Sequence, residues 1–485
     1  MFVGLLSLGQ EVLWVRAFSF AQSGTPQAFS FVLATYLTGI ALGAQVGKVI
    51  TIKSPDLWAT SGLVLLLSGA YDLASPWLLG IGAQNDVLTV AGAVIIALSS
   101  ALKAIIFPIA HHLGSDAGGP RVGRSFSRVY VANIIGSTLG PILFGFFLLD
   151  RFSTQQCFVL VALGTLLLGT SCLFRRRNYR QLIGAGALAA IGAILFSVPE
   201  HLIQNISGLS RQITKVVETR QGIITIYPGS REGDLIYGGN AYDGRTNLDP
   251  VINSNGINRA LILSVLKDKP ERVLMVGLSI GTWLKLVTAF PGVKHIDVIE
   301  INPGYLKAIE DYPAHASALR DPRVSVHMDD GRRWLRAHPE ASYDLVIMNT
   351  TFHWRAYSSN LLSRDFLADL STHMHPGAIL AYNGTGSPDV LKTAATVFPH
   401  AYWYGSFVVA SDFDFRPLLD TPQGRMRLKS LAIDGKPLFP AGSDATVEAF
   451  VRTPFVTVET VAAGRQRPLE VITDRNLLTE YKYGR

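Results

Sequence analysis

The stretch RVLMVGLSIGTWLKLVTAFPGVKHIDVIEINP, from Arg272 to Pro303, decides the fold of the C-terminal part of this chain. An apolar segment typical of a buried strand leads into a glycine turn, Gly277 to Gly281, and a second apolar strand ends at Glu300. Glycines in such a turn let backbone N–H groups approach a ligand. A carboxylate 23 residues after Gly277 can accept hydrogen bonds from both hydroxyls of a ribose. The stretch therefore predicts a Rossmann-like βαβ unit with a nucleoside site.

The 485 residues divide near residue 200 into two parts of different composition. The first part consists of apolar runs long enough to cross a hydrocarbon layer of about 30 Å, which takes about 20 helical residues. Seven candidate spans cover residues 2–20, 27–50, 57–80, 87–112, 130–150, 155–174 and 182–199. We therefore expect a multi-span α-helical transmembrane domain over residues 1–200, with the lipid membrane as a partner.

The charges give conflicting indications of which side of the membrane the second part occupies. Basic residues gather in loops around 48–53, 121–128 and 175–180, which marks these loops as cytoplasmic. Seven full spans would then place the second part outside, whereas a cofactor made in the cytosol requires the opposite side. We expect a multi-pass protein of the cell inner membrane with a cytoplasmic catalytic domain, in which the first or the last apolar segment does not cross.

Charge and cysteine content also indicate whether nucleic acids or metals are expected as ligands. Much of the net charge of +7 sits in the loops beside the spans, so we expect no nucleic-acid partner. The two cysteines, Cys157 and Cys172, lie in one apolar segment and cannot form a metal site by themselves, so we predict no metal. Charged residues within the spans, such as Lys103, are costly in lipid and either line a substrate path or form pairs.

The second part of the chain, after about residue 200, is predicted to comprise three regions. Short alternating segments from Gln212 onward predict a small β module over residues 210–257. Strand and helix units then repeat, with strands in VSVHMDD (324–330), YDLVIMN (343–349) and AILAYN (378–383), and predict a doubly wound, mostly parallel sheet over 258–415. The segment AYWYGSFVVAS (401–411) is expected to complete the edge of this sheet. Residues 416–485 are expected to form a C-terminal appendage.

Several segments resemble the spermidine synthase (polyamine aminopropyltransferase) family, in its membrane-fused type. They are ETRQGIITIY (218–227), VLMVGLSIG (273–281), VIEINP (298–303), DPRVSVHMDDGRRWL (321–335) and YDLVIMN (343–349), with LSLGQEVLWVR (6–16) and RVYVANIIGSTLGPILFG (128–145) in the apolar part. The resemblance implies a small β module on a Rossmann-like methyltransferase-type domain. It also implies S-adenosylmethionine, or its decarboxylated form, as the cofactor.

The resemblance also assigns the cofactor-binding residues. By position, Glu300 is expected to hold the ribose and Asp330 the adenine amino group, while Gly277 and Gly281 line the sulfonium. The adjoining residues Leu278, Ser279, Ile301 and Gly331 complete the expected cofactor site.

Two acids that the family normally carries are absent. The glycine turn has Leu278-Ser279-Ile280, and the fourth strand is followed by Asn349. In the family these acids bind the propylamine cation of the cofactor and deprotonate the attacking amine, which an alkyl or amide group cannot do. We therefore favour methyl transfer from S-adenosylmethionine to a small nucleophilic acceptor. Aminopropyl transfer with His353 as the base, and a non-catalytic nucleoside sensor or scaffold, are the alternatives.

The loop NTTFHWRAYSSNLLS (349–363) carries the densest set of reactive side chains. It follows a predicted strand at the end where a substrate should lie. We predict catalytic roles for three of its residues: His353, Asn349 and Tyr357. Four residues are predicted to bind the acceptor: Tyr242, Asp243, Trp354 and Arg355. An ordinary surface loop and an ordinary hairpin are the structural alternatives, and the fold leaves a homo-oligomer open.

Overall fold

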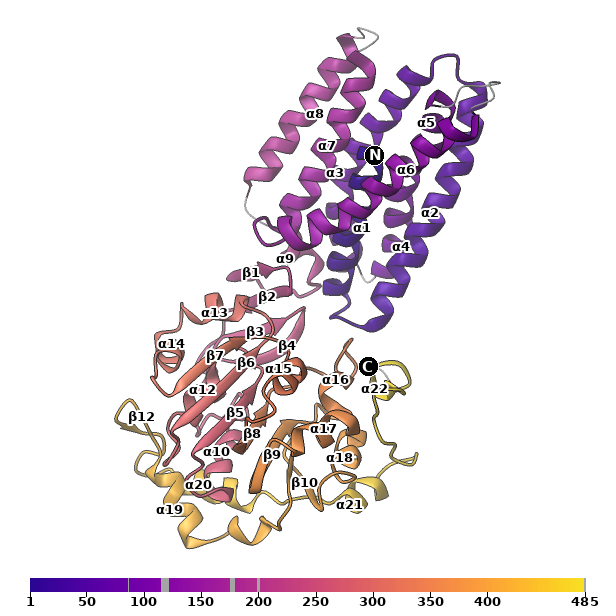
Figure 1. The fold of residues 1–485 in the computed structure, drawn as a ribbon. Coiled ribbons are helices and arrows are strands. Elements are labelled where there is room, and N and C mark those ends of the chain that lie inside the picture. Colours follow the sequence, from indigo (N-terminus) through magenta and orange to yellow (C-terminus); the bar gives the residue numbers. More distant parts are fainter. Residues whose placement is uncertain (86, 115–121, 175–178, 199–200, 484–485) are drawn as a thin grey trace. The chain divides into compact units, whose positions relative to one another are not determined.

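The computed structural model describes the chain except for residues 86, 115–121, 175–178, 199–200 and 484–485 (Figure 1). The chain forms two compact units. The first comprises Met1–Gln212 with Glu218–Arg220, and the second comprises Ile213–Val217 with Gln221–Arg485. The first unit therefore ends close to the change in composition near residue 200.

The first unit is helical. Its elements are α1 (Phe2–Ala21), α2 (Pro26–Lys53), α3 (Leu57–Gln84), α4 (Leu88–Ala104), α5 (Ile106–Gly114), α6 (Val122–Ile142), the π-helix η1 (Leu143–Leu148), α7 (Thr154–Phe174), α8 (Tyr179–Ser197) and α9 (Leu202–Ile206). Among the described residues, five helical segments are long and apolar enough to cross a membrane: Pro26–Lys53, Leu57–Gln84, Leu88–Gly114, Phe126–Leu148 and Thr154–Phe174. The predicted first span forms α1, and Ile183–Ser197 of the predicted last span is a shorter apolar helix.

Small residues allow α2 to pack closely against α4 and the start of α5. A Cβ atom would lie 2.2 Å from the carbonyl oxygen of Ala97 at Gly39, and 2.2 Å from that of Ala101 at Gly43. At Gly47 the equivalent distance, to the oxygen of Ile105, is 2.5 Å. Any side chain would therefore push the backbones apart, which is the reason that small residues line such interfaces in membranes.

A charged group in the centre of this unit is neutralised by its neighbours. The Lys103 Nζ of α4 lies 2.6 Å from the Asp72 Oδ2 of α3 and donates to the Gln10 Oε1 of α1 at 2.7 Å. Gln10 Nε2 donates to Asp72 Oδ1 at 2.8 Å, and all three side chains are buried. The ion pair and its hydrogen bonds offset the cost of burying these charges and join three helices.

The second unit begins with a small antiparallel sheet in the range predicted for the β module. Its strands are β1 (Lys215–Thr219), β2 (Gly222–Tyr227), β3 (Leu235–Gly238) and β4 (Ala241–Arg245), in the order β1-β2-β3-β4. The turn from β3 to β4 contains Gly239 and Asn240, both with positive φ, as a tight hairpin requires.

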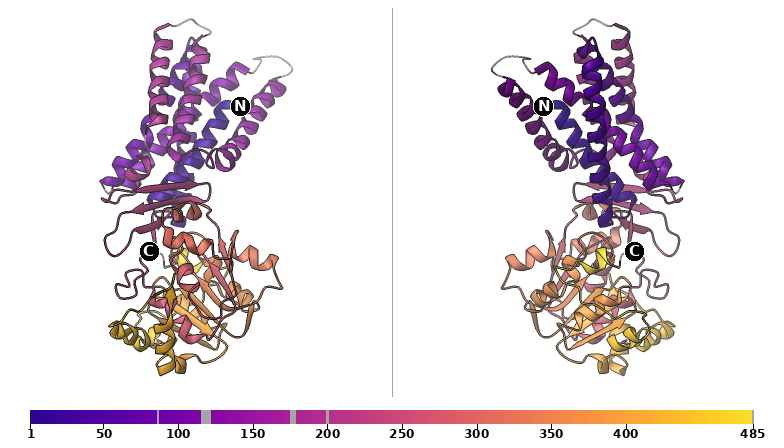
Figure 2. Two further views of the ribbon diagram at one scale, coloured as in Figure 1. Left: turned by 90° about the vertical axis from the view of Figure 1, so that its left-hand side faces the viewer. Right: turned by 90° about the vertical axis from the view of Figure 1, so that its right-hand side faces the viewer.

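A seven-stranded sheet forms the body of this unit, with helices on both faces (Figures 1 and 2). Its order is β10-β11-β9-β8-β5-β6-β7. The parallel strands are β5 (Arg272–Val276), β6 (His295–Glu300), β7 (Val324–Met328), β8 (Tyr343–Met348) and β9 (Met374–Asn383). β11 (Phe407–Ser411) pairs antiparallel with β9, and β10 (His400–Tyr404) pairs antiparallel with β11, so AYWYGSFVVAS completes the edge as predicted.

The central strands of the sheet are buried on both faces because apolar residues point to each side of it. In β5, Val273 and Met275 belong to one hydrophobic core, whereas Leu274 and Val276 belong to a second core on the opposite face. Helices of the first core are α10 (Asn258–Leu261), α11 (Leu263–Leu266), α12 (Thr282–Val287), α13 (Gly304–Ile309), α14 (Pro313–Leu319), α19 (Pro422–Ser430) and α20 (Asp444–Arg452). Helices of the second core are α15 (Gly331–Ala337), α16 (Ser359–Leu362), α17 (Arg364–Ser371), α18 (Pro388–Ala394) and α22 (Leu478–Tyr481). The predicted fold class is therefore confirmed.

The C-terminal region packs against the α/β unit rather than extending from it. Its remaining elements are η2 (Arg416–Leu418), β12 (Ala432–Ile433), β13 (Lys436–Pro437) and α21 (Val458–Ala463). Ile472 and Leu478 are buried in the second core. Arg467 forms an ion pair of 2.5 Å with the buried Asp389, at the start of α18.

Candidate active site

Two adjoining cavities lie at the carboxyl ends of β5, β6 and β8, where α/β sheets bind ligands. The larger has a volume of about 380 Å³ and the smaller about 240 Å³. Residues that line both are Asp243, Gly277, Ser279, Asn349, Thr350 and Thr351. The two cavities therefore meet at the glycine turn, as a site for two reacting molecules requires.

The glycine turn depends on backbone conformations that side chains disfavour. Gly277 has φ +87°, and a Cβ atom there would lie 2.7 Å from the carbonyl oxygen of Asn349. Gly281 has φ +78° and precedes α12, while Ser279 between them adopts φ +49°. Glycine is thus required at Gly277 by both conformation and space, and the turn brings the backbone to the edge of the cavities.

Glu300, at the end of β6, is buried and lines the larger cavity. Leu278 N–H donates to its Oε2 at 2.7 Å, and Asn302 N–H donates to its Oε1 at 2.8 Å. These bonds fix the carboxylate and leave each oxygen a further lone pair. Burial raises the pKa of Glu300 to about 7, with the two N–H groups opposing that shift. The geometry fits a carboxylate that accepts from neighbouring hydroxyls.

Most of the other residues predicted to bind the cofactor line the same cavity, but Gly281 is not among the described residues that line either one. Asp330 precedes α15, and its Oδ1 accepts from the N–H of Arg333 at 2.9 Å, so the carboxylate also caps the helix. Gly331 follows it, and Ile301 exposes 58 % of its surface beside Glu300. Asp330, Gly331 and Ile301 all line the larger cavity, whereas Leu278 lines the smaller one.

Asp243, in β4, lies where the two cavities meet. The Tyr305 hydroxyl donates to its Oδ2 at 2.5 Å. Burial raises the pKa of Asp243, and the hydrogen bonds from Tyr305 and Ser279 and the charge of Arg355 oppose that shift only in part. Tyr242, its neighbour, lines the smaller cavity. Asp243 is thus a carboxylate with raised proton affinity at the boundary of the two sites.

Some residues of the loop 349–363 line the cavities, and others do not. Asn349 lines both cavities, and Arg355 and Tyr357 line the larger one, where Tyr357 exposes 80 % of its surface. His353 and Trp354 are not among the described residues that line either cavity. The Nδ1 of His353 is 3.0 Å from the carbonyl oxygen of Thr385, and burial lowers its pKa. Trp354 stacks on Phe352 with ring centroids 5.3 Å apart, so the roles predicted for His353 and Trp354 stay untested.

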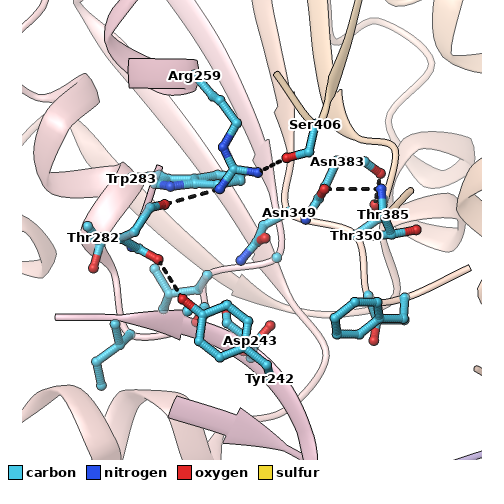
Figure 3. A pocket seen from close by; sticks show the side chains of 18 residues that line it. Tyr242, Asp243, Arg259, Thr282, Trp283, Asn349, Thr350, Asn383, Thr385 and Ser406 are labelled. Atoms are coloured by element: carbon cyan, nitrogen blue, oxygen red, sulfur yellow. Dashed lines mark hydrogen bonds between the residues drawn. The ribbon is translucent and has the colours of Figure 1, made fainter. Parts of the chain in front are cut away.

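The sequence interpretation missed a cationic side chain in the smaller cavity. Arg259, in α10, lines this cavity with Trp283 and Ser406 (Figure 3). Its guanidinium carbon lies 5.4 Å from the ring centroid of Trp283 and 4.8 Å from that of Phe407. Arg259 belongs to NSNGINRAL (253–261), and no pattern in that segment indicates that its side chain turns toward a cavity.

A second missed residue holds the wall of the larger cavity. Glu480, in α22, is buried, and its carboxylate accepts from the backbone N–H groups of Tyr357 at 2.9 Å and Ser359 at 2.8 Å. Both donors belong to the loop that follows β8. A residue more than a hundred positions away therefore sets the conformation of this loop, which no local pattern could indicate.

Together, the sheet order, the glycine turn after β5 and the buried carboxylate at the end of β6 define a Rossmann-like unit of the methyltransferase type. Residues 261–394 match the family model of the spermine/spermidine synthase domain. Over these residues, which follow an N-terminal unit of apolar helices, the chain is similar to the spermine/spermidine synthase family.

Comparison with individual proteins finds similarity to polyamine aminopropyltransferases. The chain is 24 % identical over 388 residues to a polyamine aminopropyltransferase of Mycobacterium tuberculosis (strain CDC 1551 / Oshkosh), which covers 76 % of this chain and 72 % of that protein. It is 25 % identical over 297 residues to polyamine aminopropyltransferase 2 of Streptomyces coelicolor, covering 58 % of this chain and 51 % of that protein. A crystal structure of spermidine synthase in complex with the transition state analogue AdoDATO is 14 % identical, has a TM-score of 0.41, and covers 50 % of this chain and 86 % of that one.

Proposed function

We propose that this chain is a membrane-bound transferase that moves the aminopropyl group of decarboxylated S-adenosylmethionine to a small acceptor. The observation that carries the proposal is the Glu300 carboxylate, which lines the larger cavity beside the glycine turn. The similarity to polyamine aminopropyltransferases favours the aminopropyl group over a methyl group. The larger cavity would hold the nucleoside and the smaller one the acceptor.

The residues around the larger cavity suit the nucleoside part of this cofactor. The free lone pairs of Glu300 can accept both ribose hydroxyls. Asp330 can accept from the exocyclic amine of adenine, and Ile301 offers apolar surface to a base or sugar. When bound, the cofactor supplies an electrophilic carbon next to a sulfonium.

Asp243 takes over, in our proposal, the work of the two missing acids. It is the acidic side chain that the two cavities share among the described residues. A carboxylate there can balance the ammonium group of the aminopropyl chain, and its raised pKa favours accepting a proton. This role replaces the predicted one for His353, whose Nδ1 is engaged by Thr385.

The step conserves atoms and charge. The lone pair of a neutral acceptor amine forms the new N–C bond, the C–S bond breaks, and its electron pair stays on sulfur as neutral methylthioadenosine. The acceptor arrives as an ammonium ion, and the proton that it loses to become the attacking amine passes to the carboxylate of Asp243. Asn349, on the border of the cavities, can orient either molecule through its amide but cannot take up this proton.

Methyl transfer from S-adenosylmethionine is the second candidate. The specific observation in its favour is that Ile280 and Asn349, both lining the smaller cavity, are neutral where the family carries acids. A methyl group needs no counter-charge, and transfer to a good nucleophile requires mainly in-line positioning. The two candidates differ in the nucleoside that they release.

The decisive experiment incubates the detergent-purified full chain with each cofactor and a mixture of acceptors, and identifies the nucleosides by mass spectrometry. Methylthioadenosine from the decarboxylated cofactor, with an aminopropylated product, is the expected result. Adenosylhomocysteine from S-adenosylmethionine would support methyl transfer instead. If neither cofactor binds in calorimetry, both enzymatic candidates fail and a scaffold role gains support.

Asp243→Asn tests the assignment of the base. We expect kcat to fall by about a hundredfold or more, with the dissociation constant of methylthioadenosine within about threefold of the parent value. Glu310→Gln, which neutralises an exposed acid of the same unit, is the matched control. Equal loss of activity in both variants, or none in Asp243→Asn, would refute the assignment.

We further propose that the helical unit lies in the cell inner membrane with the α/β unit in the cytoplasm. Five described helices of sufficient length and hydropathy support the membrane location. The side is inferred from the cytosolic origin of the cofactor, and a protease protection experiment on inverted and right-side-out vesicles would decide it. A homo-oligomer stays a prediction.

A further inference from the structure

The smaller cavity contains a cation whose charge is not balanced by an acid. No carboxylate lies within 4 Å of the Arg259 guanidinium among the residues that the structure describes, although many other arginines of the chain are paired. Burial lowers its pKa to about 10, which still leaves it charged at neutral pH. An unpaired, largely desolvated guanidinium in a cavity is costly, and an anionic ligand would remove that cost.

The hydrogen bonds of Arg259 leave it able to bind a carboxylate through two N–H groups. Nε donates to the Gly256 carbonyl at 2.9 Å, Nη2 donates to the Asn255 carbonyl at 3.1 Å, and Nη1 donates to the Ser406 hydroxyl. These bonds use one hydrogen of each nitrogen. Within the described part of the chain, one hydrogen on Nη1 and one on Nη2 remain, which is the pair that a carboxylate accepts in a bidentate contact.

The neighbours of Arg259 fix this orientation. Trp283 and Phe407 flank the guanidinium, and these two aromatic rings pack edge to face with centroids 4.8 Å apart. An arginine held against two aromatic rings loses little entropy when it binds, which favours its use as a recognition group.

The smaller cavity has a cationic side chain on one side and an acidic side chain on the other. In the view of Figure 3, Arg259 reaches the cavity from one side, Asp243 from the opposite side, and Asn349 lies between them. Neutral amides and hydroxyls make up most of the remaining polar lining. One end of the cavity therefore suits an anion and the other suits an amine.

We propose that the acceptor is a zwitterion of the amino acid type, whose carboxylate binds Arg259 and whose amine faces Asp243. This inference rests on the proposed aminopropyl transfer and names the acceptor class of the same site. A diamine of similar length would place an ammonium group against Arg259, so the cavity disfavours diamines through like-charge repulsion.

The test compares matched acceptors of equal chain length with the parent protein. Diaminoalkanes and ω-amino acids of three to five carbons, for example 1,4-diaminobutane and 4-aminobutanoate, share the nucleophile and differ at the far end. With decarboxylated S-adenosylmethionine, we expect kcat/KM for the preferred amino acid to exceed that of its diamine by about thirtyfold or more, the value of one charge-assisted contact. A preference for the diamine would overturn the inference while leaving aminopropyl transfer standing.

A binding measurement separates failure of the inference from failure of the proposed function. In calorimetry with saturating methylthioadenosine, 4-aminobutanoate is expected to bind at least tenfold more tightly than 1,4-diaminobutane, whether or not turnover occurs. Absence of any turnover together with this binding preference would refute the proposed function alone. Equal or reversed affinities would refute the acceptor class.

Arg259→Gln is expected to lower amino acid affinity by about thirtyfold and to leave methylthioadenosine affinity unchanged, which also shows that the variant is folded. Arg320→Gln, a change of the same kind at an exposed position, is the control. If Arg259→Gln weakens both ligands equally, the side chain has a structural role and the inference is wrong.

Discussion

The affinity of the larger cavity for a nucleoside should rise with pH through neutrality. Burial raises the pKa of Glu300 to about 7, despite the opposing N–H groups of Asn302 and Leu278. An ionised carboxylate accepts from both ribose hydroxyls without rearrangement. A protonated carboxyl group carries a hydrogen on one oxygen, and that hydrogen must itself find an acceptor. Nucleoside binding therefore favours the ionised form, and a bound ribose should lower the pKa of Glu300.

The size of the pH effect on the dissociation constant follows from the pKa of Glu300. With a pKa of about 7, roughly one molecule in ten carries an ionised Glu300 at about pH 6, so the dissociation constant there should be about tenfold higher than at about pH 8.5. The contribution of Glu300 to the unfolding free energy changes with pH in the opposite direction to its contribution to nucleoside affinity. Because the folded pKa lies above the ordinary value of 4.5, the folded state binds more protons between these two pH values. The unfolding free energy should fall by about 3 kcal/mol as pH rises through this window.

Titration calorimetry of the full chain with methylthioadenosine, at steps between about pH 5.5 and 8.5, measures this dependence. Methylthioadenosine is suitable because it carries no group that titrates in this range. Glu300→Gln removes the titrating group, so its affinity should be low and independent of pH. The amide also turns its NH₂ group toward one of the two backbone donors, which leaves an N–H unsatisfied and costs about 1 to 3 kcal/mol of stability at low pH.

A flat profile in the parent protein would refute the assignment of Glu300 as the ribose acceptor. So would a profile that keeps its slope in Glu300→Gln, because the titrating group would then be another residue. Asp243 is one such candidate, since its charge contributes to the raised pKa of Glu300. The Asp243→Asn variant, measured in the same way, should shift the midpoint to slightly lower pH.

Three further predictions concern stability. Gly277→Ala should cost at least 2 kcal/mol more than Gly386→Ala in thermal unfolding, because both have positive φ but only the Cβ at Gly277 would meet a backbone atom. Lys103→Met should lower stability in detergent by about 3 to 5 kcal/mol by leaving Asp72 buried and unpaired, and adding Asp72→Leu should restore most of the loss. Asp330→Ala should cost about 1 kcal/mol by removing the cap of α15, while Asp330→Asn should retain the cap; equal losses would contradict this role.

The fold could be predicted because the sequence patterns that indicate it each lie within a short segment. Apolar runs of strand length, a glycine turn and a carboxylate at the next strand end indicate the βαβ unit, and the structure has β5, the turn and β6 within one or two residues of the predicted positions. The helical unit was predictable from hydropathy, although two of the seven predicted spans, the first and the last, fall outside the five described helices that meet the length and hydropathy criteria for a membrane span. The residues predicted to bind the cofactor belong to these local elements, so the sequence could place Glu300 and Asp330 at the same cavity, while their roles stay predictions.

The acceptor side could not be predicted in the same way. Arg259 faces the cavity because Trp283 and Phe407, from distant elements, flank it. Asp243 was predicted to bind the acceptor, but the burial that raises its pKa, against the opposing hydrogen bond from Tyr305, could not be read from the hairpin sequence. His353 was predicted to be catalytic from its place in the loop; it is not among the described residues that line either cavity, and its predicted role stays untested. Such roles depend on tertiary packing, which a single sequence does not encode in any short window.

The hydrogen bonds from Tyr357 and Ser359 to Glu480 have a consequence for biosynthesis. The loop beside the nucleoside cavity reaches its final conformation only after α22 has been translated. The apolar helices leave the ribosome first and can enter the bilayer while the α/β unit is still being synthesised. A chain truncated before α22 should therefore hold this loop less firmly and bind methylthioadenosine more weakly than the full chain, which titration calorimetry of the two proteins would detect.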